Sequence, residues 1–190
     1  MTPRRQGRLV VLSGPSGVGK TTVGRLLLKG SLTLARSVSA TTRPRRAGER
    51  EGRDYRFLTE AAFEALRRRD GLLEWARVHG RRYGTPKAPV EAALRRGKDV
   101  LLVIDVQGAR QIRRRAPGAL FLFLVPPSMT VLKRRLQGRG TESVQAFRLR
   151  LAAARREMAE RHRYDHILVN RRLAVTVRRA RALIRPPRPR

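Results

Sequence analysis

The sequence predicts an α/β fold with a mostly parallel central sheet. Two strand-length runs, 100–105 and 120–125, are apolar without alternation, as expected for strands that helices cover on both faces. Segments with helical spacing of apolar residues separate these runs along the chain. A glycine-rich turn follows the first apolar run, 8–13, and leads into a helical segment. These three observations together favour alternating strands and helices.

Each element can then be assigned from its own pattern. The expected strands are 8–13, 100–105, 120–125 and, as a shorter run of the same kind, 166–169. The expected helices are 21–29, 60–69, 87–96, 107–115, 128–136 and 143–162. The last helix carries apolar residues three and four positions apart: Val144, Phe147, Leu151, Ala154 and Met158. This stripe predicts packing against the core rather than a ligand surface.

The segment 36–85 interrupts the alternation. Short extended runs, 36–40, 54–57 and 72–78, surround one helix there. We therefore expect one domain over 1–184, in which a lobe, 36–85, is inserted into a core formed by 8–35 and 86–184. The residues 185–190 read Arg-Pro-Pro-Arg-Pro-Arg and are expected to be a basic disordered tail.

The composition is strongly basic. In 190 residues there are 45 Lys and Arg against 14 Asp and Glu, a formal charge of +31, while 41% hydrophobic residues argue against wholesale disorder. Such a charge suggests a polyanion such as RNA, DNA or a nucleotide phosphate, but an arginine-biased surface is equally compatible. The absence of cysteine excludes disulfides and a thiol nucleophile. No apolar run approaches the roughly 20 residues of a membrane span, so we expect a cytoplasmic protein.

The strongest motif lies between the first strand and the first helix. It matches the pattern G-x-x-x-x-G-K-[ST] and reads Gly14-Pro15-Ser16-Gly17-Val18-Gly19-Lys20-Thr21. Such a loop turns its backbone N–H groups toward phosphate oxygens, and the following helix adds its positive end. Lys20 is expected to reach the outer phosphates, and the Thr21 hydroxyl suits Mg²⁺. The motif predicts binding of a nucleoside triphosphate.

Further polar residues stand in informative places. Asp105 closes a buried strand, where it could help to hold Mg²⁺ through water or cap the next helix. Hydroxyls and guanidiniums suited to phosphate gather in a short stretch: Ser39, Thr41, Thr42, Arg43, Arg45 and Arg46. Glu74 lies inside an apolar run, and its carboxylate could accept both N1–H and N2–H₂ of a guanine base. A salt bridge to an arginine is the competing interpretation of Glu74.

These residues belong to a longer series of strings through which the chain resembles the guanylate kinase family from Arg8 to about Ile184. Besides the glycine-rich loop, the strings are Ser37-Val38-Ser39-Ala40-Thr41-Thr42-Arg43, Gly48-Glu49, Gly52-x-Asp54-Tyr55, Leu73-Glu74-Trp75-Ala76, Tyr83-Gly84-Thr85, Ile104-Asp105-Val106-Gln107-Gly108, Pro126-Pro127-Ser128, Gly138-Arg139-Gly140-Thr141 and Val169-Asn170. Their order and spacing match throughout, so the resemblance is specific.

The resemblance implies a P-loop NTPase three-layer fold with a mixed α/β GMP-binding lobe and a small lid, 138–150. It implies Mg²⁺-dependent transfer of the ATP γ-phosphate to GMP or dGMP, giving ADP and GDP or dGDP. ATP would be bound by Gly14, Pro15, Ser16, Gly17, Val18, Gly19, Lys20, Thr21, Thr22, Arg135 and Asn170. GMP would be bound by Ser39, Arg43, Arg46, Tyr55, Glu74, Tyr83, Thr85 and Asp105. The catalytic residues would be Lys20, Arg43, Asp105, Arg139 and Arg150.

The sequence departs from the family pattern at three places. Val103 stands where an acidic residue is usual, two positions before Asp105. The proline in Arg43-Pro44-Arg45-Arg46 comes one position early, which aligns Arg46 with the second phosphate-binding arginine. Arg171-Arg172 replaces an acidic pair after the asparagine.

Three alternatives compete with this interpretation. A sugar-phosphate kinase acting on a ribose bisphosphate would not need Glu74 and Thr85. A non-catalytic interaction module would not need the P-loop lysine and the lid arginines. A nucleic-acid-binding protein is favoured by the charge, but the nine aromatic residues do not cluster beside Lys/Arg runs in the sequence. Non-specific, charge-driven binding of nucleic acid remains compatible with kinase activity.

Overall fold

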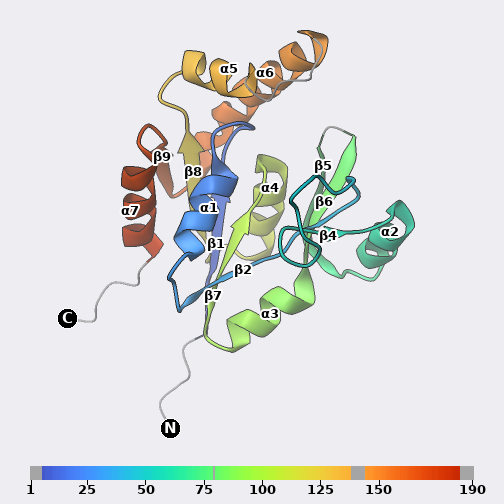
Figure 1. Ribbon diagram of the computed structural model, residues 1–190. Coiled ribbons are helices and arrows are strands. Elements are labelled where there is room, and N and C mark those ends of the chain that lie inside the picture. Colours follow the sequence, from blue (N-terminus) through green and yellow to red (C-terminus); the bar gives the residue numbers. More distant parts are fainter. Residues whose placement is uncertain (1–5, 79, 138–143, 185–190) are drawn as a thin grey trace, which may run out of the picture. The chain divides into compact units, whose positions relative to one another are not determined.

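The computed structural model describes residues 6–78, 80–137 and 144–184 (Figure 1). These residues form two compact units. Unit 1 comprises the described residues within Met1–Leu9, Leu32–Leu102 and Gln107–Ala119. Unit 2 comprises those within Val10–Ser31, Val103–Val106 and Leu120–Arg190. The predicted tail, 185–190, and the first part of the predicted lid, 138–143, lie outside the described residues.

Unit 2 contains three parallel strands in the order β1-β8-β9. They are β1 (Leu9–Ser13), β8 (Leu120–Val125) and β9 (His166–Val169). Its helices are α1 (Lys20–Leu28), α5 (Met129–Gln137), α6 (Val144–Ala159), the 3₁₀ turn η1 (Glu160–Arg163) and α7 (Leu173–Ile184). In the register, Val11 lies opposite Phe121, and Phe123 lies opposite Ile167. α7 packs against α1, as the red and blue helices show in Figure 1.

The core of unit 2 confirms the predicted role of the apolar stripe on α6 for four of its five residues; the burial of the fifth, Val144, lies outside what the structure describes. Leu132 and Leu136 of α5 form a buried cluster with Ala154, against which Phe147 and Leu151 pack. Met158, from the same stripe, contacts a neighbouring cluster on β8. Apolar residues at this spacing lie on one side of a helix. This side of α6 packs against α5 and β8.

One prediction about unit 2 is wrong, and one helix was missed. β9 is a strand, but it is not covered on both faces, because Ile167 and Val169 are 47% and 49% exposed. β9 ends the strand order, and only Leu168 on its other face is buried. The missed helix is α7, although Val177, Ala180 and Ile184 recur at helical spacing and are buried.

Unit 1 contains a parallel pair and a mixed four-stranded sheet. The pair is β2 (Leu34–Arg36) and β7 (Asp99–Val103), with Leu34 opposite Asp99. The sheet has the order β4-β3-β6-β5, formed by β3 (Ala40–Thr41), β4 (Arg56–Phe57), β5 (Leu72–Val78) and β6 (Arg81–Pro86). Its helices are α2 (Glu60–Arg68), α3 (Lys87–Arg95) and most of α4 (Val106–Arg115).

The mixed sheet has a small core of its own. Phe63 of α2 is fully buried against Ala40 and Leu72, and Trp75 packs at the edge of this cluster. α2 begins where Thr59 accepts a hydrogen bond from the Ala62 N–H at 3.1 Å, a helix cap that fixes its start. β6 was not predicted, because its arginines, glycine and proline conceal the strand pattern.

The predicted α/β fold is confirmed, since β1, β8 and β9 pair in parallel, as do β2 and β7. β7 ends at Val103, so Ile104 and Asp105 follow the strand rather than finishing it. Among the described residues, no helix is long and apolar enough to cross a membrane.

Candidate active site

The glycine-rich loop joins β1 to α1 in unit 2, as predicted. Gly14 and Gly19 have φ angles of 139° and 101°, which residues other than glycine rarely adopt. A Cβ on Gly14 would lie 2.4 Å from the Leu124 carbonyl oxygen, and one on Gly19 would lie 2.7 Å from Asn170 Nδ2. The loop is therefore closed against β8 and Asn170, and only glycine fits there.

Lys20 is the first residue of α1 and folds back over this loop. Its ammonium Nζ donates to the Gly14 carbonyl at 2.6 Å and to the Pro15 carbonyl at 3.2 Å. Gly19 precedes the helix and has no side chain to cap the first turn, which contains Thr21 and Thr22. A lysine and a helix N-terminus that meet at one loop suit a phosphate.

Two distant residues, Arg135 and Asn170, meet the loop at the Val18 carbonyl. Asn170 Nδ2 donates to it at 2.8 Å, and Arg135 Nη1 donates at 3.3 Å. Arg135 Nη2 also donates to the Asn170 carbonyl at 3.1 Å, and Thr176 donates to Asn170 Oδ1 at 3.2 Å. Both residues assigned to ATP by resemblance are thus brought together at the glycine-rich loop.

The sequence reasoning missed a carboxylate at this loop. Glu157 of α6 accepts a hydrogen bond from the Ser16 backbone N–H at 3.0 Å, across 141 residues of sequence. Glu157 stands seven positions after Arg150, and two helical turns place both on nearly the same side of α6. Arg150 is buried. Arg139, the other lid arginine, lies outside the described residues.

Asp105 lies at the same end of β1 as the glycine-rich loop. The Ile104 N–H donates to the Leu12 carbonyl at 3.3 Å, so the chain that leaves β7 runs beside the last residues of β1. Asp105 follows and is half-buried. Within the described ranges no group of three or more acidic or histidine side chains could hold a metal ion by itself.

The second predicted cluster lies in unit 1, where Glu74 and Thr85 face one another across β5 and β6. The Thr85 hydroxyl donates to Glu74 Oε1 at 2.6 Å, and the two residues are only 0% and 4% exposed, respectively. A Cβ on Gly108 of α4 would lie 2.3 Å from Glu74 Oε2. The glycine in the Ile104–Gly108 string therefore makes room for a buried carboxylate.

The candidates for phosphate binding gather around Arg43 in unit 1. Arg43 lies 5.3 Å from the centre of the Tyr55 ring, and the rings of Tyr55 and Tyr83 meet edge to face at 6.1 Å. Burial raises the pKa of Tyr55, so its hydroxyl stays protonated and can donate to an anion. Ser39 is half-buried in the same region, and its carbonyl accepts from the Arg56 N–H at 2.9 Å.

Glu49 was named only as part of a motif, but it organises this cluster. Its carboxylate accepts from Arg43 Nη2 at 2.8 Å and Nη1 at 3.0 Å, and from the Arg46 backbone N–H at 2.8 Å. The Arg43 guanidinium lowers the pKa of Glu49, and Glu49 in turn raises the pKa of Arg43. The Arg46 side chain is exposed. The sequence signal that could have predicted this role is the spacing of Arg46 and Glu49, which stand three residues apart in a turn.

A strand, a glycine-rich loop that ends in a lysine, and a helix that starts at this lysine define a P-loop nucleotide-binding protein. The family model for guanylate kinase matches residues 6–186. The chain therefore belongs to the guanylate kinase family.

Individual relatives agree with this family. Guanylate kinase from Gloeobacter violaceus is 51% identical over 177 residues, which cover 93% of this chain and 86% of the relative. Guanylate kinase from Nocardia farcinica is 51% identical over 168 residues, 87% of each chain. The crystal structure of guanylate kinase from Anaplasma phagocytophilum superposes with a TM-score of 0.80 at 34% identity, covering 95% of this chain and 86% of that one.

The family and the fold confirm the activity predicted from the sequence. The chain is a nucleoside monophosphate kinase that transfers a phosphoryl group from ATP to GMP. The P-loop NTPase fold class is likewise confirmed. The sugar-phosphate kinase and the non-catalytic interaction module are not favoured by these relatives.

Proposed function

We propose that Glu74 and Thr85 read the guanine base of GMP. The observation that carries this proposal is that the Glu74 carboxylate is buried and accepts a hydrogen bond from the Thr85 hydroxyl. This carboxylate lies against Gly108 of α4, where any larger residue would place a Cβ 2.3 Å from Glu74 Oε2. A carboxylate is acceptor-only, and guanine offers two adjacent donors, N1–H and N2–H₂. Adenine offers an acceptor at N1, which would meet the carboxylate with like partial charge. The pair therefore selects guanine and rejects adenine.

The GMP phosphate is assigned to Arg43 with Ser39, Arg46, Tyr55 and Tyr83. Glu49 holds Arg43 by two hydrogen bonds, so the guanidinium is oriented before a nucleotide arrives. A bound phosphate dianion then adds to an arginine whose position is already fixed, which limits the entropy lost on binding. The two tyrosine hydroxyls supply uncharged donors beside it.

The ATP phosphates are assigned to the backbone N–H groups of the glycine-rich loop and to Lys20. In this structure Lys20 satisfies loop carbonyls, and it would exchange them for phosphate oxygens as ATP binds. Arg135 and Asn170 hold the loop at Val18, on the side assigned to adenine. Arg139 and Arg150 remain assigned to the phosphoryl group in transfer. No strong general base is needed, because the acceptor is already an anion.

Mg²⁺ fits the donor set around this loop. The Thr21 hydroxyl in the first turn of α1 and the half-buried Asp105 carboxylate, acting through water, are oxygen donors of the kind that Mg²⁺ prefers alongside phosphates. When bound, the ion would neutralise charge on the ATP phosphates. The groups assigned to GMP address its base and phosphate, so we expect dGMP to serve as acceptor too. The cytoplasmic location expected from the sequence stays a prediction.

An acceptor panel tests the guanine assignment. ADP formation is measured in a coupled assay with GMP, dGMP, AMP, UMP and ribose bisphosphate at equal concentration. We expect turnover with the two guanine nucleotides and turnover lower by at least about a hundredfold with the others, because they do not offer Glu74 the two adjacent N–H donors of guanine. Comparable turnover with AMP or UMP would contradict the role of Glu74 and Thr85. Comparable turnover with ribose bisphosphate would favour a sugar acceptor.

A further inference from the structure

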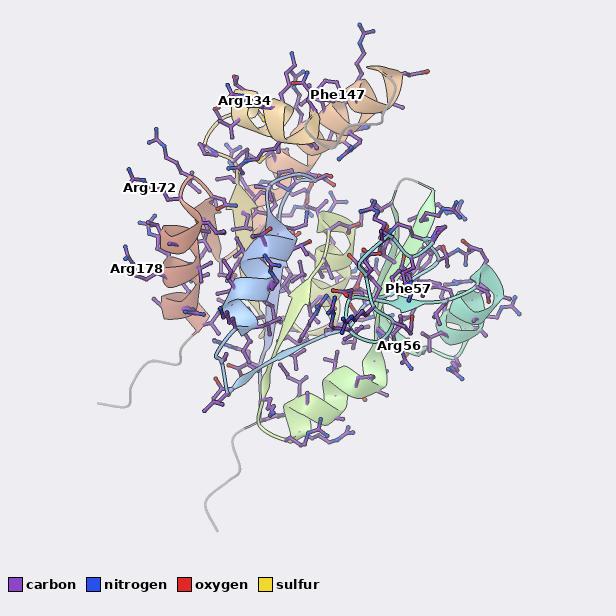
Figure 2. All side chains as sticks on the ribbon, viewed as in Figure 1. Arg56, Phe57, Arg134, Phe147, Arg172 and Arg178 are labelled. Atoms are coloured by element: carbon purple, nitrogen blue, oxygen red, sulfur yellow. The ribbon has the colours of Figure 1, made fainter. Side chains whose placement is uncertain are left out.

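The glycine-rich loop receives a carboxylate from the end of α6. Glu157 Oε2 accepts a hydrogen bond from the Ser16 backbone N–H at 3.0 Å, and both residues belong to unit 2. Glu157 is half-buried and stands in the last turn of α6, whereas Phe147, which Figure 2 labels, lies nearer the start of this helix. The helix dipole disfavours an anion in the last turn, so the stability of α6 itself does not explain the position of Glu157.

The peptide group between Pro15 and Ser16 shows on which side of the loop this carboxylate lies. Its carbonyl oxygen accepts from Lys20 Nζ and from the Val18 N–H, each at 3.2 Å. Among the described residues all peptide bonds are trans, and the carbonyl and the N–H of a trans peptide point in opposite directions. The Glu157 carboxylate therefore lies on the side of this peptide away from the Lys20 ammonium. It does not take the place beside Lys20 that is assigned to the ATP phosphates.

Glu157 holds a tight turn within the loop. The hydrogen bond from the Val18 N–H to the Pro15 carbonyl closes a β-turn, and Gly17 within it has a φ of 81°, as the third residue of a type II turn requires. A Cβ on Gly17 would lie 2.8 Å from Leu136 Cδ2, so α5 packs closely against the same turn. The carboxylate from α6 and the packing of α5 together fix the path of this turn.

The other end of the turn is held in a complementary way. The Val18 carbonyl accepts from Asn170 Nδ2 and from Arg135 Nη1, so a backbone acceptor at this end and the Ser16 N–H at the first end are both bound by side chains of other elements. A backbone cradle binds phosphate when its N–H groups converge on one point. A path that is fixed beforehand limits the conformational entropy that the loop loses when ATP binds.

We propose that Glu157 is a positioning residue for ATP binding. It holds the peptide between Pro15 and Ser16, so that the loop keeps its shape while Lys20 moves from the loop carbonyls to the ATP phosphates. The proposal rests on the assignment of the ATP phosphates to this loop. The competing role for an anion at the loop is to occupy a phosphate position and to leave when ATP binds. The orientation of the peptide argues against that role, because the carboxylate and the Lys20 ammonium lie on opposite sides of it.

The kinetics of Glu157→Ala and Glu157→Gln test the proposal. Alanine removes the acceptor of the Ser16 N–H, so KM for ATP should rise by at least about tenfold, while KM for GMP should change less than about twofold. Glutamine keeps an acceptor oxygen and should bring KM for ATP back to within about threefold of the wild type. A lower KM for ATP in either variant would show that the carboxylate competes with phosphate and would overturn the proposal. An unchanged KM for ATP in Glu157→Ala, or no recovery in Glu157→Gln, would overturn it too.

Two further variants separate this role from other effects. Glu160→Ala is the matched control, because Glu160 follows α6, pairs with Arg163 at 3.3 Å, and its loss changes the net charge equally. This control should leave KM for ATP within about twofold of the wild type, and a rise equal to that of Glu157→Ala would overturn the proposal. Near-normal turnover in Lys20→Met would instead refute the assignment of ATP to the loop. Loss of turnover in Lys20→Met with an unchanged KM for ATP in Glu157→Ala would overturn only the role of Glu157.

Backbone amide resonances of the wild type test the proposal even if Glu157→Ala does not fold. The protein is titrated with a non-hydrolysable ATP analogue and Mg²⁺, and the amide chemical shifts are followed by NMR. The amides of Gly19 and Lys20 should shift strongly, because they gain phosphate as an acceptor. The Ser16 amide should shift less, because its N–H keeps the carboxylate of Glu157. A Ser16 shift as large as that of Lys20 would show that this N–H changes its partner and would overturn the proposal.

Discussion

The phosphate sites that we propose in unit 1 and unit 2 differ in their chemistry. In unit 2 the glycine-rich loop offers backbone N–H groups, and the cation Lys20 is held by neutral carbonyl oxygens of the loop itself. In unit 1 the candidate phosphate site offers side chains, and its cation Arg43 is already paired with the carboxylate of Glu49. The first site depends on the path of the backbone, and the second depends on the identity of individual side chains.

The difference matches what each site has to distinguish. A backbone cradle recognises phosphates, which every nucleoside triphosphate carries in the same form. Glu74 and Thr85 are buried and paired, and in the role that we propose for them they would recognise a pattern of donors that belongs to one base. We therefore expect that the loss of one charge at the ATP site abolishes most activity. At the GMP site we expect single substitutions to reduce activity in smaller steps, mainly by raising KM for GMP.

The largest effect is expected from Lys20→Met. The substitution removes the cation assigned to the ATP phosphates, and kcat/KM should fall by about three orders of magnitude. Lys133→Met, an exposed lysine of α5, is the matched control and should keep near-normal kinetics. Steady-state assays and circular dichroism check the activity and the fold. Near-normal kcat in Lys20→Met would remove the lysine from the mechanism.

A smaller effect is expected from Glu49→Gln. The amide keeps one acceptor but loses the charge-assisted pair that orients Arg43, so KM for GMP should rise about tenfold while kcat changes little. Glu51→Gln changes a neighbouring carboxylate that accepts from the Phe57 N–H, and it should not alter KM for GMP. A lower KM in Glu49→Gln would mean that Glu49 competes with the GMP phosphate instead of preparing its site.

The stability of Gly108→Ala tests the close approach of α4 to Glu74 in the site assigned to the GMP base. Alanine normally stabilises a helix by about 1 kcal/mol relative to glycine. Here its Cβ would lie 2.3 Å from Glu74 Oε2, so we expect a net loss of about 1–3 kcal/mol and a higher KM for GMP. Gly118→Ala meets no atom within 4 Å and is the control. Denaturant unfolding measures both, and a stabilised Gly108→Ala would contradict the close approach.

The smallest effect concerns acid stability of unit 1. Hydrogen bonds from Arg67, and then from Arg82, lower the pKa of Glu64 from 4.5 to about 2. A carboxyl group whose folded-state pKa is lowered stabilises the fold above its unfolded pKa, and this stability is lost as pH falls through the folded value. The melting temperature should therefore fall between about pH 4.5 and 2. Glu64→Gln should flatten that decline, and an unchanged acid profile would contradict the role of Glu64.

Local patterns were enough to predict most elements of the fold. The glycine-rich loop, the strand before it and the helix after it lie where the motif required, because their signals are contiguous in the sequence. α7 was missed because its arginines, Arg178 and Arg179, obscured a regular apolar spacing. The exposed face of β9 was unpredictable from its apolar run, since exposure there depends on its place at the end of the strand order.

The candidate site was predictable where a motif names the residue and not where distant residues meet. Glu157 reaches Ser16 across 141 residues, and no local pattern marks that contact. Gln111 shows the same limit, because it forms two hydrogen bonds with the backbone of Trp75, which stands 36 residues away in the sequence.

The most direct measurement of the central claim compares GMP with IMP as acceptors for the wild type and Glu74→Gln. IMP lacks the N2 amino group, so its base offers the Glu74 carboxylate one hydrogen-bond donor instead of two. The wild type should prefer GMP in kcat/KM by at least about tenfold, and Glu74→Gln should lower kcat/KM for GMP by about a hundredfold and bring the GMP-to-IMP ratio close to one. An unchanged ratio in Glu74→Gln would show that another residue reads the base.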